Sequence, residues 1–401
     1  MSDYSEKNIF DNHGFNFTVA ACDCEVDHFH PSKGTIKRTF HLYPKDNKYD
    51  YAYMAGHGLV NRTNKNRAVM PELLAIKNGD VDAVEAFIKQ YGFILPLNPD
   101  GYNSIDSEHI FTLINRLKAT VALISALRER KINCEKIMSL TMYLLLSPQI
   151  GTGLPSKDNQ IITSYHEMGD IWHNIRSVEK RNLETEDEAV HQGFNIDDTV
   201  RPPYTFVSTL EYIEMIDPDL NNADNLKSKI MYYFVHAKSS SYHCRLAIDF
   251  IYHFINEIGE IRAWNHDGYL VFAEDDPGAA AKIKNGLDNQ LQAALLKLSK
   301  HTLKTEIDFN LNGIVPSYDT ESMVPSWCID YLLAGLYFSV FYMRSGEIYR
   351  SCAKCGRLFQ ISITSAKKKY CSDSCRNAMA QHNHRLRNIA REANASGDSR
   401  Q

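Results

Sequence analysis

The stretch SCAKCGRLFQISITSAKKKYCSDSCRNAMAQHNHRLR, residues 351–387, contains four cysteines in two close pairs. Two residues separate Cys352 from Cys355, and three separate Cys371 from Cys375. A C-x2-C turn directs two sulfurs toward one ion, and cysteines four positions apart share one face of a helix. The pattern predicts a closed site in which four thiolates hold one tetrahedral zinc ion. Iron–sulfur or redox use of the cysteines stays open as an alternative.

The segment between the two pairs, residues 356–370, predicts a β-hairpin, and a helix is expected to begin at Cys371. A minimal core for the hairpin would come from four apolar side chains: Leu358, Phe359, Ile361 and Ile363. A cysteine turn followed by a hairpin and a helix is a treble-clef arrangement. Because four cysteines leave no open coordination position, the predicted site is structural and not catalytic.

Charge is distributed unevenly along this chain of 401 residues, whose formal net charge is −5. Residues 350–401 contain 11 Lys and Arg but only 3 Asp and Glu, a net of +8, so the remainder has a net of −13. A basic segment attached to an acidic body predicts an anionic partner for that segment. A terminal segment that is charged only for solubility is the alternative interpretation.

The helix expected after Cys375 has two different faces. One stripe, which contains Met379, His382 and Leu386, is expected to pack against the hairpin or the body. The opposite face of the helix contains side chains that can contact phosphates and base edges. Arg and Lys hold phosphates, and Asn and Gln read bases. The predicted nucleic-acid contacts are Lys367, Lys368, Lys369, Arg376, Gln381, His384, Arg387 and Arg391. A solvated basic helix that merely supports the finger is the alternative.

The cysteine segment resembles the CGNR-type zinc fingers of bacterial proteins. These fingers have the form C-x2-C-G-x-x-F followed by Y/W-C-S-x-x-C and a basic helix. The matching residues here are Cys352, Cys355, Gly356, Phe359, Tyr370, Cys371, Ser372 and Cys375. The chain departs from the name-giving motif, since it reads Cys-Arg-Asn-Ala from Cys375, and so resembles a variant of the family. The resemblance covers about 40 residues and implies a helical N-terminal domain and a DNA-binding regulator.

The expected fold class is α+β, with a mainly helical body over residues 1–345 and the finger over residues 350–393. A small β-rich part is expected at residues 15–60, where apolar and polar residues alternate. Residues 177–203 are polar and acidic, which predicts a long loop. Residues 394–401 are expected to form a disordered tail.

Several elements of the body can be predicted from capping and turn residues. Asp80 is expected to cap a helix that ends at Gly92. Residues 261–272 predict a hairpin, and residues 107–127 and 134–146 predict apolar helices. Two further helices are expected over residues 277–298 and 325–344.

The composition is that of a soluble, cytoplasmic protein. The N-terminus lacks an apolar region typical of a secretory signal. The best candidate for a membrane span, residues 331–343, is shorter than the roughly 20 residues that a span needs, so a buried helix is expected. Crowding of four of the nine cysteines into one short segment indicates a metal site in a reducing compartment.

Two other clusters are weaker candidates for sites. His166 and Glu167 are adjacent, but the next histidine is His173, and zinc proteases need histidines four positions apart on a helix. Cys22 and Cys24 precede two histidines, His28 and His30, and ordinary core cysteines are the favoured interpretation. No sequence motif in the body indicates catalysis.

The sequence therefore predicts a zinc-binding, DNA-binding transcriptional regulator of bacterial origin. RNA stays open as the nucleic acid, and a homodimer stays open as the assembly, because one finger gives limited affinity. A protein-interaction scaffold with a purely structural finger is the alternative from another class. An enzyme hidden in the body has no motif to support it.

Overall fold

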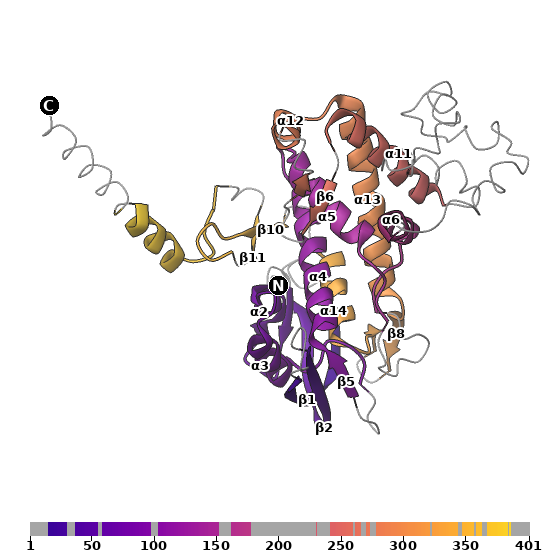
Figure 1. The fold of residues 1–401 in the computed structure, drawn as a ribbon. Helices are drawn as coiled ribbons and strands as arrows, with labels where there is room; N and C mark the ends of the chain where they lie inside the picture. Colours follow the sequence, from indigo (N-terminus) through magenta and orange to yellow (C-terminus); the bar gives the residue numbers. More distant parts are fainter. Residues whose placement is uncertain are drawn as a thin grey trace, which may run out of the picture. The chain divides into compact units, whose positions relative to one another are not determined.

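Figure 1 shows the computed structural model of the chain. It describes residues 15–29, 37–54, 58–97, 103–151, 162–177, 230, 241–259, 261–265, 270–272, 278–320, 323–343, 347–356, 358–362, 367–383 and 385. Helices and strands are both abundant, which confirms the α+β class. Of the polar loop only residue 177 is described, and the expected tail lies outside the described residues.

The chain forms two compact units. The first unit combines Met1–Ser107 with Gly313–Gln401, and the second is the continuous segment Glu108–Asn312. This is a different division from the expected body of residues 1–345 followed by a finger. The first unit is assembled from both ends of the chain, and the finger segment belongs to it.

An antiparallel sheet of five strands forms the N-terminal part of the first unit. Its long strands β1 (Asn16–Phe29) and β2 (Lys37–Met54) pair with each other, and β2 also pairs with β3 (Gly58–Asn61) and β5 (Asn103–Asp106). The short strand β4 (Arg67–Ala68) pairs with β3. Strands thus occupy most of the segment for which alternation predicts β structure.

Three helices accompany this sheet: α2 (Val69–Ala75), α3 (Val81–Tyr91) and α14 (Leu332–Phe341). The side chain of Asp80 accepts a hydrogen bond from the Ala83 amide, and Gly92 follows the last residue of α3 with φ 78°. Both predicted ends of α3 are therefore confirmed. The helix α14 is buried from Leu332 to Val340, in agreement with the prediction for this apolar run, and only Phe341 at its end is exposed.

The C-terminal part of the first unit contains two hairpins. Strands β8 (Val315–Asp319) and β9 (Val324–Cys328) form one, and β10 (Glu347–Ser351) and β11 (Leu358–Ser362) form the other. The prediction of one helix over residues 325–344 was wrong at its start, because residues 324–328 form β9. Pro325 is tolerated both at the first position of a helix and in a two-stranded ribbon, so it does not distinguish the two.

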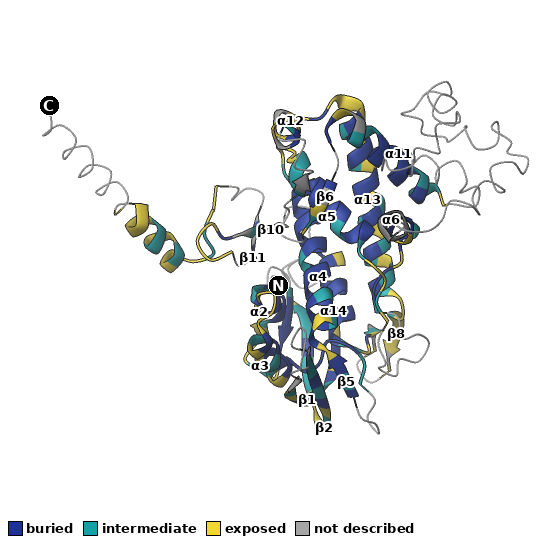
Figure 2. Ribbon diagram, viewed as in Figure 1, coloured by how far each residue is buried: buried dark blue, intermediate teal, exposed yellow. Residues whose placement is uncertain are grey.

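The second unit is mainly helical, and Figure 2 shows that its helices are largely buried. Its buried core is apolar. It contains most of α4 (Ser107–Arg128), and α5 (Cys134–Leu146), α6 (Glu167–Ser177), α11 (Tyr242–Glu257), α12 (Ala279–Asn285) and α13 (Asn289–Leu311). Strands β6 (Ile261–Trp264) and β7 (Leu270–Phe272) form the predicted hairpin. The long helix α13 packs against both α5 and α11.

One predicted helix of the second unit is two helices in the structure. The prediction over residues 277–298 spans the whole of α12 and the start of α13. Gly286, with φ 105°, ends α12, and Asp288 caps α13 by accepting hydrogen bonds from the amides of Gln290 and Leu291. A glycine after one helix and an aspartate before the next are ordinary stop and start signals.

The helix α4 is long and apolar enough to cross a membrane by length and composition alone. However, 83% of its most apolar window is buried inside the protein. Burial of this kind is typical of a core helix in a soluble protein.

Candidate metal centre

The first cysteine pair lies in the turn of the hairpin formed by β10 and β11. Ser351 pairs with Leu358, so the turn between them contains both Cys352 and Cys355. Gly356 has φ 72°, and its amide donates a hydrogen bond to the Cys352 carbonyl at 2.9 Å. Glycine adopts this left-handed conformation without strain. The predicted hairpin is therefore corrected: its turn is the cysteine turn itself, and one of its strands precedes Cys352.

The second cysteine pair is placed by a helix N-terminus. Residues 373–383 are helical, and the Ser372 hydroxyl accepts a hydrogen bond from the Cys375 amide at 3.3 Å. Cys375 therefore lies in the first turn, whereas Cys371 precedes the helix, which corrects the prediction that the helix begins at Cys371. The Ala353 amide donates to the Lys369 carbonyl at 2.9 Å and so joins the two halves of the finger.

The four sulfur atoms converge on one point. The Sγ atoms of Cys352, Cys355, Cys371 and Cys375 all lie within 4.8 Å of one another. Cys371 Sγ is 3.6 Å from the sulfur of Cys355 and 3.6 Å from that of Cys375. A tetrahedral zinc ion with sulfur at about 2.3 Å separates its sulfurs by about 3.8 Å. The cluster thus fits a tetrahedral metal ion. Among the described residues, no other group of His, Cys, Asp or Glu side chains is placed to hold one.

The electrostatics of the thiols favour a bound cation. Burial raises the pKa of Cys352, but hydrogen bonds from the backbone of Cys371, Cys355 and Lys354 outweigh it and lower the pKa to about 6. Burial and hydrogen bonds with the neighbouring thiols raise the pKa of Cys371 to about 12. The Cys352 thiolate therefore forms readily, whereas a positive charge between the sulfurs would favour ionisation of Cys371.

The core around the cysteines is small. Cys352, Phe359 and Ile361 are buried, and Tyr370, Cys371 and Cys375 pack against them. Phe359 and Ile361 were both predicted core residues. The Leu358 side chain and Ile363 lie outside what the structure describes. Because so small a core contributes little burial free energy, a bound metal would supply much of the stability of this segment.

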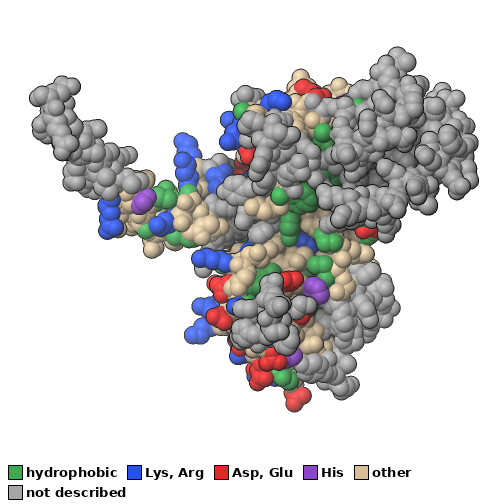
Figure 3. All heavy atoms as spheres, viewed as in Figure 1, with side chains coloured by type: hydrophobic (Ala, Val, Ile, Leu, Met, Phe, Trp, Pro, Cys, Tyr) green, Lys and Arg blue, Asp and Glu red, His purple; other side chains and the backbone are tan. Residues whose placement is uncertain are grey.

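The predicted nucleic-acid contacts are exposed where the structure describes them (Figure 3). Lys367, Lys368, Lys369 and Gln381 are exposed. Arg376 is also exposed, and it forms an ion pair with Asp373 at 3.1 Å. The remaining predicted contacts, His384, Arg387 and Arg391, lie outside the described residues.

The packing stripe predicted for the finger helix is only partly present. Met379 is half-buried, but His382, which was expected on the same stripe, is exposed. In the described part of this helix, Cys375 is the residue that packs against the core of the finger.

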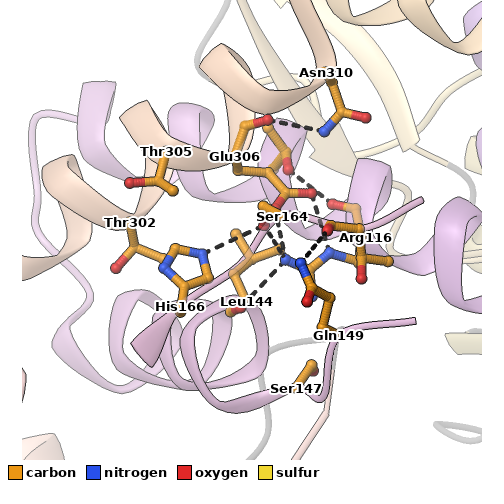
Figure 4. A network of polar contacts seen from close by, with 12 residues as sticks. Arg116, Leu144, Ser147, Gln149, Ser164, His166, Thr302, Thr305, Glu306 and Asn310 are labelled. Atoms are coloured by element: carbon orange, nitrogen blue, oxygen red, sulfur yellow. Dashed lines mark hydrogen bonds and ion pairs between the residues drawn. The ribbon is translucent and has the colours of Figure 1, made fainter. Parts of the chain in front are cut away.

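Sequence reasoning missed a buried ion pair in the second unit. The Arg116 guanidinium on α4 meets the Glu306 carboxylate on α13 at 3.2 Å through Nε and 2.6 Å through Nη2 (Figure 4). The Ser164 hydroxyl accepts from Arg116 at 2.6 Å and donates to Glu306. Burial alone would raise the pKa of Glu306, but Arg116 and Ser164 hold it below its usual value. The network is closed to solvent and fixes two helices and a loop together.

Three histidines stand in a row beside this network. The ring centroids of His166 and His243 are 5.8 Å apart, and those of His243 and His301 are 5.6 Å apart. Burial, together with the charge of Arg116, lowers the pKa of His166 to about 3. Burial and the neighbouring His301 lower the pKa of His243 to about 4. The His166 and His243 rings are therefore neutral at physiological pH.

The two weaker candidate sites do not form metal clusters among the described residues. Cys22 and Cys24 are buried in β1, and burial raises their pKa values to about 11 and about 12. They are protonated core thiols, as the favoured interpretation expected. The His28 side chain and His30 lie outside the described part of the chain, as does the side chain of His173.

No protein-family model matches the chain, and neither a curated protein nor a solved structure shows significant similarity to it.

Proposed function

We propose that the protein is a zinc-binding transcriptional regulator that contacts DNA through its C-terminal finger. The convergence of four sulfur atoms at tetrahedral spacing is the observation that carries this proposal. A cysteine turn in a hairpin, joined to a capped helix, supports a treble-clef-like finger. Four thiolates with no open position suit a structural Zn²⁺ ion better than a catalytic one.

DNA binding is supported by the surface of the finger and by its sequence. Exposed Lys and Arg side chains surround the cysteines, and the helix exposes Asn377 and Gln381. The resemblance to CGNR-type fingers of bacterial proteins adds the role of a regulator. The same proposal assigns the protein to the bacterial cytoplasm, where thiols stay reduced and free to hold a metal.

Fluorescence anisotropy of the zinc-loaded protein with mixed-sequence duplex DNA tests this function. Binding is expected to weaken steeply between about 50 and about 200 mM salt, because phosphate contacts release counterions. Replacing both Cys371 and Cys375 by serine should abolish the binding. Absence of binding at the lower salt concentration would disprove the proposal.

A scaffold role with a purely structural finger is the second candidate. It is favoured by one contact, because β11 of the finger lies against α2 within the first unit. A finger that serves only to pack on its own unit would leave DNA binding absent while zinc remains bound. Salt-dependent self-association without DNA binding would support this second candidate.

A further inference from the structure

Lysines from two separate segments meet along one edge of the cysteine turn. Lys354 lies within the turn, between Cys352 and Cys355. The hydrogen bond from the Ala353 amide to the Lys369 carbonyl, at 2.9 Å, places residues 367–369 alongside this turn. Arg350 Nη1 donates to the Lys368 carbonyl at 3.5 Å and holds the same segment against β10. We name the surface of Lys354, Lys367, Lys368 and Lys369 the knuckle edge.

The lysines of the knuckle edge are available to a partner. Lys354, Lys367 and Lys369 are exposed, and none pairs with a carboxylate in the part of the chain that the structure describes. The Lys368 ammonium lies over the Phe359 ring, 5.7 Å from its centroid, which orients it on the finger core. By contrast, Arg376 on the helix is already paired with Asp373. In the described part of the finger, Lys354, Lys367 and Lys369 thus present exposed ammonium groups beside the turn, whereas Arg376 shares its charge with Asp373.

The chemistry of this edge suits phosphate groups. A zinc ion with four thiolates has a net charge of −2, so the four lysines keep the edge positive when the metal is bound. Lysine ammonium groups are compact point charges without the fork of arginine, and they bind phosphate oxygens without distinguishing bases. The neighbouring helix exposes Asn377 and Gln381, whose carboxamides read base edges. A lysine edge beside exposed carboxamides favours a nucleic acid over an acidic protein surface.

We propose that the knuckle edge binds the phosphate backbone of duplex DNA, while the helix carries the contacts to bases. This inference rests on the proposed function and divides it between two faces of the finger. Affinity comes from the turn and the lysine segment, and sequence discrimination comes from the exposed carboxamides of the helix. The sequence already indicated phosphate contacts for Lys367, Lys368 and Lys369 and base contacts for the helix, but it could not place this segment beside Lys354.

The test compares salt dependence in three forms of the full-length, zinc-loaded chain. The first is the unchanged protein, and the second combines Lys354→Gln, Lys367→Gln and Lys369→Gln. The third is a control that loses the same charge from exposed lysines outside the finger: Lys77→Gln, Lys131→Gln and Lys300→Gln. Anisotropy titrations with mixed-sequence duplex DNA between about 50 and about 200 mM salt give the slope of log K against log salt for each form.

The knuckle-edge variant is expected to lower the magnitude of this slope by about 2.7, or about 0.9 for each phosphate that the protein no longer neutralises. Its affinity should fall by a similar factor on every duplex. The control should keep the slope of the unchanged protein, and Gln381→Ala should keep it as well. All variants should retain one zinc per chain, because none of the changed side chains belongs to the four sulfur ligands.

Each outcome separates this inference from the function on which it rests. If the unchanged protein binds DNA and the knuckle-edge variant has the same slope, the inference is wrong and the proposed function stands. If the unchanged protein does not bind at the lower salt concentration, both are wrong. If polyglutamate at equal charge competes as well as DNA, the edge is a general anion surface and its assignment to duplex DNA fails.

Discussion

Gly335 lies in α14 directly against the ring of Phe17 from β1. A Cβ atom at Gly335 would lie 2.2 Å from Phe17 Cζ, far inside van der Waals contact. Phe17 is itself stacked on Tyr51, with centroids 5.2 Å apart, and on Phe15 at 6.2 Å. The ring therefore cannot turn away without disturbing its neighbours. Glycine is required at this position because the helix approaches the sheet closely, and not because of its backbone conformation.

Gly335→Ala is expected to destabilise the protein by roughly 1–3 kcal/mol, because an added methyl group overpacks the contact with Phe17. Urea unfolding followed by tryptophan fluorescence measures the change. Adding Phe17→Leu to Gly335→Ala should recover part of the loss, since a smaller side chain admits the methyl group. If the two substitutions simply add, the ring is not the obstacle.

Single residues divide clearly into those that the sequence identifies and those that it does not. Asp80 and Gly92 are identified, because a cap acts on amides and carbonyls within one turn of itself. The pairing of Arg116 with Glu306 is not, because 190 positions separate the two residues along the chain. Only the packing of α4 against α13 reveals that these charges are buried together.

At the scale of the element, the finger combines a small core with four cysteines that could hold a metal ion. In the described part of the finger, the core around the cysteines consists of Cys352, Phe359 and Ile361, and Tyr349 on β10 is also buried. Burial of this size cannot offset the conformational entropy that roughly 40 residues give up on folding. Metal binding and folding of the finger are therefore expected to be coupled.

Removal of the metal by a chelator is expected to unfold the finger while the helical second unit stays folded. Hydrogen exchange should show loss of protection over residues 347–362 and 373–383 only. Cys371→Ser should release the metal in the same way, whereas Cys328→Ser, at an exposed cysteine outside the cluster, should retain one zinc per chain. Full metal content in Cys371→Ser would exclude the four-sulfur site.

Helices and strands were predicted correctly where a capping or turn residue accompanies a regular spacing of apolar residues. The hairpin over residues 261–272 and the helices α4 and α5 have such patterns. Residues 325–328 were assigned wrongly to a helix, because the run from Val324 onward has no period that separates strand from helix. The cysteine turn was identified from the spacing of its cysteines alone. Its place at the tip of a hairpin depends on β10, residues 347–351, which contains no cysteine and was not predicted as a strand.

At the scale of the whole molecule, the histidine row makes stability depend on pH. His166 and His243 have folded-state pKa values of about 3 and about 4, against 6.5 for an unfolded histidine. Unfolding therefore takes up protons wherever the pH lies between these values. The contribution of these two histidines to the free energy of unfolding is fully present above about pH 6.5. It is lost as the pH falls toward their folded pKa values.

Lowering the pH from about 7.5 to about 5 is expected to reduce the free energy of unfolding by roughly 2 kcal/mol for each of these two imidazoles. Most carboxylates titrate below this interval, but the Cys352 thiol, with its pKa lowered to about 6, titrates within it. Comparison with a histidine variant therefore isolates the share of the histidines. Urea titrations at the two pH values measure it. His166→Gln should remove about half of the dependence, and equal stability at both values would show that the histidines are not buried neutral.

The division into two units could not be predicted from the sequence. The sheet strands near the N-terminus and the helix α14 belong together only because their apolar faces meet, and no local signal connects segments more than 200 positions apart. Composition indicated the contrast between a basic finger and an acidic remainder. It contains no information about which part of the remainder the finger joins.

The assembly of the first unit from both chain ends has a consequence for synthesis on the ribosome. The five-stranded sheet is translated first, but α14, which covers Phe17, follows only after the whole second unit. At roughly 5–20 residues per second, translation of Glu108–Asn312 delays the synthesis of α14 by about 10–40 seconds after that of the sheet. During that interval the second unit can fold by itself, while the nascent sheet exposes an apolar face. The early chain is thus the part of this protein that most needs chaperone protection.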